Sequence, residues 1–216
     1  MPPRALEPAG VALVDKPAGP SSFAIVAQIR RVTGAKTGHA GTLDPFATGL
    51  LLILSGRSTK LAPALVGLDK RYLTIVDLTT TTTTGDPEGD VVEQHDAPEA
   101  LALDALRGEV ELPVPAASAV KIDGERAYRL HRRGVEVEMP LRRSTVHALE
   151  VVERDAISVT LDLRVSSGTY VRSIAQALGG HCRTLRRTEV GPFSIDEASP
   201  PESFTLLGEA EVLARL

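Results

Sequence analysis

Aliphatic runs and amphipathic stretches follow one another along the chain without a regular alternation of strand and helix. Residues 11–15 and 49–56 are short apolar runs next to glycine or proline, which is typical of buried strands. Residues 71–78 alternate and are rich in β-branched side chains, so they predict another strand. We expect two more strands at 144–153 and 156–166, and a short one at 190–195.

Helices are indicated by their end signals. Ser21 and Ser22 can cap a helix that Gly34 ends, and Asp96, Pro98 and Glu99 predict a helix running to Arg107. Further helices are expected at 58–67, at 124–134, after a turn in 168–180, and at 206–216. Thr79 to Thr84 are interpreted as a strand continuing into a loop. This mixture predicts an α+β fold around a mixed sheet.

Composition limits the class of protein. The chain has 216 residues, 43% of them hydrophobic, enough for one large domain or two small ones. Its single cysteine, Cys182, allows no intrachain disulfide and fits a reducing cytosol. The five histidines show no metal-ligand spacing, so no metal site is expected. The N-terminus does not resemble a signal peptide, and the longest aliphatic run, 50–54, is too short for a bilayer.

Charge is distributed unevenly. Residues 85–111 contain nine acidic side chains and one base, whereas 164–187 contain five arginines and no acid. Residues 121–143 carry seven bases against four acids. A polyanion could therefore bind one basic face while the acidic segment lies elsewhere, although charged helix faces are also common in proteins that bind no nucleic acid.

The polar loop 38–45, with the sequence GHAGTLDP, is the strongest candidate for chemistry. Gly38 and Gly41 let the backbone approach a ligand closely, and Pro45 restricts the backbone around Asp44. Such a carboxylate suits a nucleophile or general base, but an Asx-turn in which Asp44 only caps its own loop is the simpler alternative. Neither a Walker loop nor a dinucleotide-binding loop matches these residues.

Five ordered segments resemble the motifs of TruB-type tRNA pseudouridine synthases. They cover most of residues 11–195, and they are VDKPAGPSS (14–22), GHAGTLDPFATGLLLILSGRSTK (38–60), KRYLTIVDL (70–78), SAVKIDGERAYRLHRRGVEV (118–137), and SSGTYVR (166–172) with LRRTEVGPF (185–193). The resemblance implies a mixed, mainly antiparallel central sheet flanked by helices, in one catalytic domain spanning residues 1–216. It also implies isomerisation of uridine to pseudouridine at position 55 in the T-loop of tRNA.

The resemblance implies three catalytic residues. Asp44 matches the essential aspartate and Arg172 the arginine that pairs with it, since a guanidinium can hold a carboxylate ionised through two hydrogen bonds. Tyr72 matches the tyrosine stacked on the target base. The target base must leave its stack, and stacking on Tyr72 can offset that cost. Because the reaction is an isomerisation, no cofactor is expected.

Five further residues are implied to bind the substrate. Tyr170 and Leu185 match residues that line the uracil pocket, and His39 matches a histidine that contacts the RNA. Lys16 and Lys70 are implied to make positional or phosphate contacts, and each could equally be a solvated surface group. The resemblance therefore implies the T-arm of tRNA as the partner, and we expect a cytoplasmic monomer with no obligate protein partner and no membrane association.

Some positions depart from the family pattern. Ala117 replaces a tyrosine, Thr83 and Ala177 each replace an aspartate, and the segment 174–185 is shorter, which affects the placement of Leu185. The family's small C-terminal RNA-binding domain, of the PUA type, is not expected here. An RNA-binding tRNA chaperone, an unrelated α+β hydrolase using Asp44, and an enzyme acting on another RNA are the alternatives. Asp44, Tyr72 and Arg172 together favour an enzyme over a pure RNA binder, and the hydrolase leaves the other four motifs unexplained. The short chain without the expected C-terminal domain favours a stand-alone tRNA enzyme.

Overall fold

The computed structural model describes residues 8–135 and 137–216. The chain forms two compact units. Unit 1 consists of Met1–Tyr72 and Arg186–Leu216, and unit 2 of Leu73–Leu185. The chain passes from one unit to the other within β4 (Lys70–Asp77) and β12 (His181–Val190). No helix in the described part of the chain is long and apolar enough to cross a bilayer.

The fold is α+β, as expected. A nine-stranded sheet has the strand order β1-β3-β12-β4-β11-β10-β7, with β2 paired to β3 and β13 paired to β12. The pairs β1–β3, β10–β11 and β7–β10 are antiparallel, whereas β3 and β12 run parallel. The sheet is therefore mixed and mainly antiparallel. Two small sheets, β5–β6 and β8–β9, complete the described strands.

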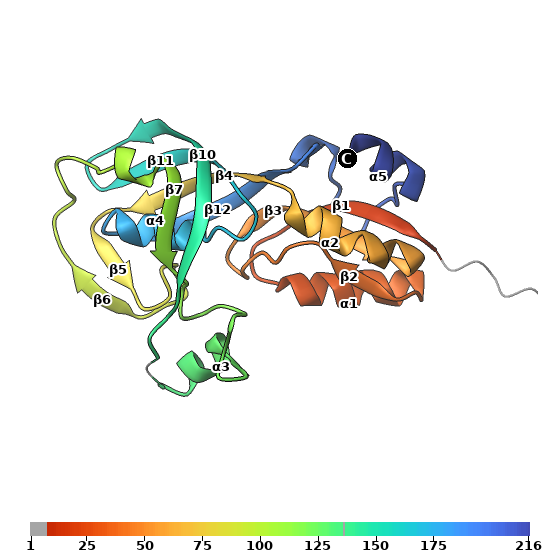
Figure 1. Cartoon of the computed structure of the whole chain (residues 1–216), viewed down its shortest axis with the longest axis horizontal. Helices are drawn as coiled ribbons and strands as arrows, with labels where there is room; N and C mark the ends of the chain where they lie inside the picture. Colours follow the sequence, from red (N-terminus) through yellow and green to blue (C-terminus); the bar gives the residue numbers. More distant parts are fainter. Residues whose placement is uncertain (1–7, 136) are drawn as a thin grey trace, which may run out of the picture. The chain divides into compact units, whose positions relative to one another are not determined.

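Unit 1 is built around the apolar strand β3, whose sequence is TGLLLILS. Figure 1 shows α1, α2, β1 and β2 around it. Every residue of β3 after Thr48 is buried, which explains its continuous aliphatic sequence. Ser21 caps the first helix by accepting a hydrogen bond from the Ala24 backbone N–H, and Gly34 ends it with a φ of 65°. The elements of unit 1 are β1 (Gly10–Lys16), α1 (Ser22–Thr33), β2 (Thr37–His39), β3 (Thr48–Ser55), η1 (Gly56–Leu61), α2 (Ala62–Gly67), β13 (Phe193–Ser194), η3 (Ile195–Glu197) and α5 (Glu209–Arg215).

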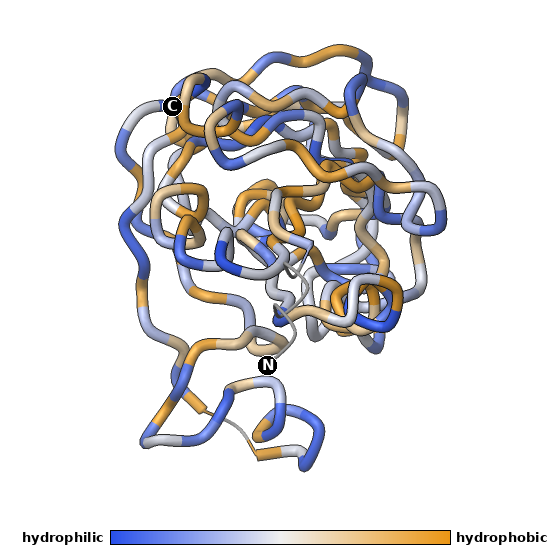
Figure 2. The backbone as a smooth tube through the Cα atoms, turned by 90° about the vertical axis from the view of Figure 1, so that its right-hand side faces the viewer, coloured by the Kyte–Doolittle hydropathy of each residue, from blue (hydrophilic) through white to orange (hydrophobic). Residues whose placement is uncertain are grey.

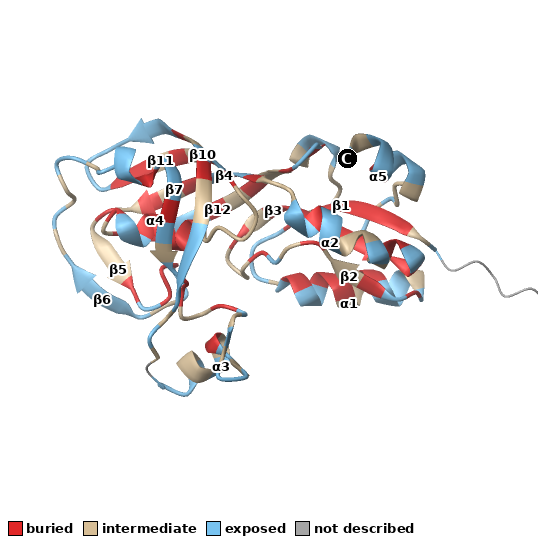
Figure 3. Cartoon of the chain, viewed as in Figure 1, coloured by how far each residue is buried: buried red, intermediate tan, exposed pale blue. Residues whose placement is uncertain are grey.

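The core of unit 1 joins segments from both ends of the chain. Leu50, Leu52 and Leu54 of β3 pack with Phe193 and with Val212 of α5, all of them fully buried. In Figure 3 the buried colour runs along β1 and β3. The C-terminal segment therefore contributes to the same core as the N-terminal motifs. It packs against β3, the strand that directly follows the loop containing Asp44.

Unit 2 is built on a long antiparallel pair of strands, β10 and β11, extended by β7. Leu161 and Leu163 of β11 are buried, as are Ile174 and Ala175 of α4. The elements of unit 2, besides its parts of β4 and β12, are β5 (Thr80–Thr82), β6 (Val91–Gln94), η2 (Asp104–Leu106), β7 (Gly108–Pro113), β8 (Lys121–Ile122), β9 (Glu125–Arg126), α3 (Ala127–Arg132), β10 (Leu141–Arg154), β11 (Ser158–Val165) and α4 (Val171–Ala177).

A small basic lobe of unit 2, residues 114–135 and 137–140, contains β8, β9 and α3 and extends from the rest of that unit (Figure 1). Figure 2 shows that hydrophilic residues recur along this lobe. The guanidinium carbons of Arg129 and Arg132 lie 5.9 and 5.8 Å from the centroid of the Tyr128 ring. The expected basic helix is present but shorter than 124–134, because 121–126 form a two-stranded hairpin instead.

Several sequence predictions were wrong. The helix expected from Asp96 to Arg107 is absent apart from the single 3₁₀ turn η2. Arg154 instead holds the backbone there by donating to the carbonyls of Pro98 and Glu99 at 2.6 and 3.0 Å. The ten-residue strand β12 was not predicted, and neither were β6 and β7. The threonine tract forms a separate strand, β5, that pairs with β6.

Candidate active site

Asp44 lies on an irregular loop of unit 1 between β2 and β3, and its side chain is partly exposed. The loop turns immediately after it, since the Ala47 backbone N–H donates to the Asp44 carbonyl at 3.2 Å. Gly41 has a φ of 98°, a conformation that other residues resist. The sequence therefore allows a turn in which an aspartate is presented at the start of a buried strand.

Two side chains from other elements hold this loop around Asp44. Ser22, in the first turn of α1, donates its hydroxyl to the Leu43 carbonyl and accepts from the Leu43 N–H, both at 2.8 Å. Lys16, at the end of β1, donates to the carbonyls of Pro45 at 3.1 Å and Ala47 at 2.6 Å. The backbone is thus fixed on both sides of Asp44.

A third side chain, which comes from β12, binds the backbone of the same loop. Arg187 of β12 is buried, and it donates through Nη2 to the Gly41 carbonyl at 3.2 Å and through Nη1 to the Thr42 carbonyl at 3.4 Å. Its Nε donates to the Leu50 carbonyl in β3 at 2.7 Å. Sequence reasoning missed this residue because it placed Arg187 among the surface bases, and only its position within the LRRT segment hinted at a different role.

Lys16 and Lys70 were expected to make positional or phosphate contacts. The side chain of Lys16 is fully buried, and Lys70 is 6% exposed. The Lys70 ammonium donates to the carbonyls of Val66 and Leu68 at the end of α2. The burial of both ammonium groups among backbone carbonyls favours the positional role over a phosphate contact.

The electrostatics of this part of unit 1 are set by burial and by Arg187. Burial first, and then the positive charge of Arg187, lowers the pKa of Lys70 to about 8, while Asp69 opposes the shift. The same two causes, in the same order, lower the pKa of His39 below its usual value. His39 Nδ1 is buried without a hydrogen-bond partner among the described residues. A neutral imidazole is therefore favoured at this end of β2.

Tyr72 lies in β4 with its residue 8% exposed. The neighbouring strand residue Arg71 pairs with Glu189 of β12 at 3.0 Å and accepts a hydrogen bond at its carbonyl from Thr188. Tyr72 is thus held on a regular strand whose first residues are fixed to Thr188 and Glu189 of β12 in unit 1. A rigid, mostly buried aromatic ring of this kind can present one face to a flat ligand.

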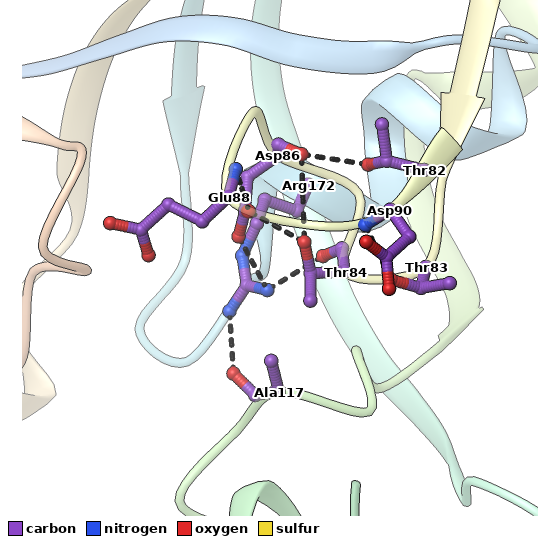
Figure 4. Close-up of polar contacts among 8 residues, drawn as sticks. All are labelled: Thr82, Thr83, Thr84, Asp86, Glu88, Asp90, Ala117 and Arg172. Atoms are coloured by element: carbon purple, nitrogen blue, oxygen red, sulfur yellow. Dashed lines mark hydrogen bonds and ion pairs between the residues drawn. The ribbon is translucent and has the colours of Figure 1, made fainter. Parts of the chain in front are cut away.

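In unit 2, Arg172 lies in the first turn of α4, and its side chain is 2% exposed. Figure 4 shows its guanidinium next to the turn that contains Thr84 and Asp86. Its Nη1 lies 3.1 Å from the Asp86 Oδ2, an ion pair in which the aspartate side chain is 4% exposed. The same guanidinium donates to the Thr84 carbonyl at 2.7 Å and to the Ala117 carbonyl at 3.0 Å. Because Ala117 contributes through its backbone, the absence of a tyrosine side chain there leaves this contact possible.

Asp86 is itself held in place. Its Oδ1 accepts from the Thr84 hydroxyl at 2.6 Å and from the Glu88 N–H at 3.0 Å, and its carbonyl accepts from Thr82 at 2.7 Å (Figure 4). The threonine tract therefore builds a turn that supplies a carboxylate to Arg172. Asp86 was not predicted as a site residue, because Thr79 to Thr84 were interpreted as a strand continuing into a loop. A carboxylate two residues after a threonine run was the available signal.

Tyr170 and Leu185, expected in the substrate pocket, both lie in unit 2. Tyr170 precedes α4 and is partly exposed, and the guanidinium carbon of Arg142 lies 5.9 Å from the centroid of its ring. Leu185 lies in β12 and is 6% exposed. The short α4 ends at Ala177, and β12 begins four residues later at His181, so Leu185 is placed by a regular strand.

The expected separation of charges was partly wrong. Arg172 and Arg187 are buried, 2% and 1% exposed, and cannot contribute to a basic surface. Asp86 and Glu111 of the acidic segment pair with Arg172 and Arg143 of the basic segments. The bases that remain exposed in the basic lobe are Lys121, Arg126, Arg129, Arg132 and Arg133. In the described part of the chain, no group of three metal-ligating side chains comes together.

Comparison with solved structures identifies the class of fold. The chain aligns with a crystal structure of a Cbf5-Nop10-Gar1 complex with a TM-score of 0.65 and 32% identity, over 87% of this chain and 50% of that one. This chain therefore spans about half the length of that one. A crystal structure of pseudouridylate synthase, 17% identical, shares the fold with a TM-score of 0.53 over 98% of this chain and 76% of that one. The fold is that of pseudouridine synthases.

Sequence comparison identifies the family. The family model for the TruB family pseudouridylate synthase (N terminal domain) matches residues 29–171. The tRNA pseudouridine synthase B of Mycobacterium sp. (strain KMS) is 44% identical over 208 residues, which is 88% of this chain and 70% of that protein. That of Thermobifida fusca (strain YX) is 40% identical over 230 residues, 95% of this chain and 78% of that protein. The chain therefore belongs to the TruB family of pseudouridylate synthases.

Proposed function

We propose that this protein isomerises a uridine of tRNA to pseudouridine, at position 55 in the T-loop. The observation that carries the proposal is the loop around Asp44, which is anchored on both sides by Lys16 and Ser22. An Asx-turn would not need such anchoring from two other elements. Membership of the TruB family supports the same conclusion.

The proposed reaction needs no net change in atoms. The N1–C1′ glycosidic bond breaks, the uracil rotates, and a C5–C1′ bond forms, while a proton leaves C5 and N1 gains one. Asp44 supplies the carboxylate that this cleavage and rejoining requires. Tyr72 stacks on the flipped base, and Tyr170 and Leu185 line its pocket.

We propose that Arg172 orients the Asp44 carboxylate in the substrate complex. Its guanidinium is well suited to this, because the carbonyls of Thr84 and Ala117 and the carboxylate of Asp86 fix its plane. Asp86 also balances the charge of a buried cation, which would otherwise be costly to keep in the protein interior. His39, held neutral by burial, contacts the RNA as a hydrogen-bonding group.

The exposed arginines of the basic lobe suit the phosphates of the T-arm. Because tRNA is the substrate, we place the activity in the cytoplasm. We expect the enzyme to act as a monomer without a cofactor or a protein partner. Sedimentation of the purified protein tests whether it is a monomer. Activity retained in excess EDTA, with no added cofactor or protein, tests whether it works without a cofactor or a partner.

The function is tested by incubating the protein with an unmodified tRNA transcript and mapping pseudouridine. Product is expected at position 55 and is expected to be lost in a transcript with cytidine there. Asp44→Asn preserves shape and removes the charge, so turnover should vanish while tRNA binding persists. Asp104→Asn is the matched control, because that side chain is fully exposed. Wild type without product, or Asp44→Asn with normal product, would contradict the proposal. Pseudouridine formed at another position of the tRNA would contradict only the assignment of position 55.

A further inference from the structure

Arg187 is a buried cation with no carboxylate partner among the described residues. Its residue is 1% exposed, and the hydrogen bonds of its guanidinium all go to backbone carbonyls, those of Gly41, Thr42 and Leu50. Burying a guanidinium with only neutral acceptors carries a desolvation cost that an apolar side chain at the same place would avoid. The charge or the shape of this side chain therefore has to serve something other than core packing.

The three acceptors belong to two different parts of unit 1. Leu50 lies in β3, whereas Gly41 and Thr42 lie in the loop three and two residues before Asp44. One planar group therefore links the loop to the sheet through donors in a fixed arrangement. A lysine has the charge but not this arrangement, since its ammonium is a single point with three rotatable donors.

The fold makes room for this contact at Gly49. This residue pairs with Arg187 in the parallel register between β3 and β12. A Cβ added to Gly49 would lie 2.3 Å from the Arg187 carbonyl oxygen, too close for any other residue. The backbones of β3 and β12 therefore approach closely at the position from which Arg187 reaches the loop.

The positive charge of Arg187 affects the pKa of two titratable groups nearby. It contributes, after burial, to the lowered pKa of both His39 and Lys70. His39 ends β2 immediately before the loop, and Lys70 lies close to the loop in space, since a Cβ built on Gly41 would lie 3.6 Å from Arg187 Nη1 and 4.0 Å from Lys70 Cε. Arg187 thus has two separable properties, the fork that binds carbonyls and the positive charge.

We propose that Arg187 of β12 is a positioning residue for the reaction at Asp44, linking the start of the loop 41–47 to β3 so that the carboxylate meets the target nucleotide in one orientation. It works together with Ser22 at Leu43 and with Lys16 at Pro45 and Ala47. The inference rests on the proposed function, because it assigns a role in the chemistry of Asp44. Small displacements of a catalytic group can reduce the rate of the chemical step by as much as about 100-fold.

The test compares Arg187→Lys with Arg187→Met. We would measure the single-turnover rate at saturating tRNA, the Kd for tRNA, and the pKa of the His39 imidazole by NMR. Arg187→Lys should lower the rate about 10-fold or more, with the Kd within about twofold and the His39 pKa unchanged. Arg187→Met should lower the rate further and raise the His39 pKa, because the positive charge is gone.

Arg215→Met is the matched control. Arg215 of α5 pairs with the exposed carboxylates of Glu197 and Glu211, so its loss should change neither rate nor His39 pKa. Urea unfolding of every variant shows which of them are folded at the assay temperature. If Arg187→Met does not fold, the rate of Arg187→Lys alone tests the positioning role, since lysine keeps the charge and the approximate length of the side chain.

Three results would overturn the proposal. The first is a folded Arg187→Lys with the wild-type rate. The second is a weaker Kd at an unchanged rate, which would make Arg187 a binding residue instead. The third is a rate that falls only in proportion to the folded fraction. If wild type itself does not modify tRNA, the proposed function fails, and backbone amide shifts of Gly41 and Thr42 in Arg187→Lys still report whether the guanidinium holds the loop.

Discussion

Arg172 and Asp86 form an ion pair of 3.1 Å in which both side chains are almost completely buried. The pair joins the start of α4 to the turn that follows the threonine tract. It therefore connects a predicted catalytic residue to a segment that looked unremarkable in sequence. Buried ion pairs are sensitive to the loss of one member, because the remaining charge has to stay in a low-dielectric interior.

Replacing Asp86 should consequently weaken the fold. Asp86→Ala removes the ion pair with Arg172 and the two hydrogen bonds that the carboxylate accepts in this turn, so the free energy of unfolding should fall by about 3–5 kcal/mol. Asp86→Asn preserves most of the shape and should cost less. Urea denaturation gives both values. Glu111→Gln, which breaks the exposed pair with Arg143, is the control and should have little effect. Equal decreases in the free energy of unfolding for Asp86→Ala and Glu111→Gln would show that the buried ion pair stabilises the fold no more than the exposed one.

Arg172→Lys tests the geometry of the same pair rather than its charge. A lysine cannot reach the Asp86 carboxylate and the carbonyls of Thr84 and Ala117 together, because it lacks the planar fork. The single-turnover rate on tRNA should fall by about 10- to 100-fold, with tRNA affinity preserved. A lysine variant with full activity would show that a positive charge alone is enough at this position.

Gly49→Ala should be poorly tolerated. The residue has a φ of 101°, and an added Cβ would lie 2.3 Å from the Arg187 carbonyl oxygen and 2.8 Å from its nitrogen. Strain and displacement of β12 should lower the free energy of unfolding by about 2–4 kcal/mol. Gly67→Ala, at the end of α2 with open space around its Cβ position, is the matched control and should be neutral or slightly stabilising. Similar Tm values for the two variants would contradict the close approach.

Local signals were enough to predict the elements that present Asp44. The serine cap and Gly34 define α1, and the aliphatic run after Thr48 defines β3, because these features depend on neighbours within a few residues. The roles of Lys16 and Arg187 could not be predicted this way. Whether a long cation is buried depends on carbonyls that come from distant segments, and nothing in a run of bases distinguishes a surface charge from an interior one.

The same reasoning explains the missed strand β12. Its sequence, HCRTLRRTEV, contains three arginines, so no clear alternation of apolar and polar residues appears. The strand exists because Leu185 and Val190 are buried while Arg187 is satisfied by carbonyls of unit 1. The prediction of a helix at 96–107 was wrong for the opposite reason, because clear local signals were present and no helix forms there. Its start signals were present, but Pro98 and Glu99 are held by Arg154 of β10.

Lys70 should make stability depend on pH in the alkaline range. Its pKa is lowered to about 8 in the folded state, against about 10.4 for an unfolded lysine. Between these values the unfolded chain binds more protons than the folded chain, so the free energy of unfolding rises with pH through this contribution. The difference in unfolding free energy between wild type and Lys70→Met, measured by urea denaturation from pH 7 to 10.5, should therefore change in favour of wild type as pH rises. A constant difference would mean that Lys70 titrates normally.

The basic lobe should carry much of the salt dependence of tRNA binding. Arg129 and Arg132 of α3 are exposed and lie beside the Tyr128 ring, where a phosphate could approach both. Each phosphate contact removed should reduce the slope of log K against log salt by about one. Arg129→Gln and Arg132→Gln should weaken binding and flatten this slope, while the single-turnover rate at saturating tRNA stays unchanged, because neither residue belongs to the loop around Asp44. Arg57→Gln, a 74% exposed side chain in η1, is the control. Slopes that remain at the wild-type value in both α3 variants would place the phosphate contacts elsewhere, and a loss of saturated rate in them would give α3 a part in the chemical step.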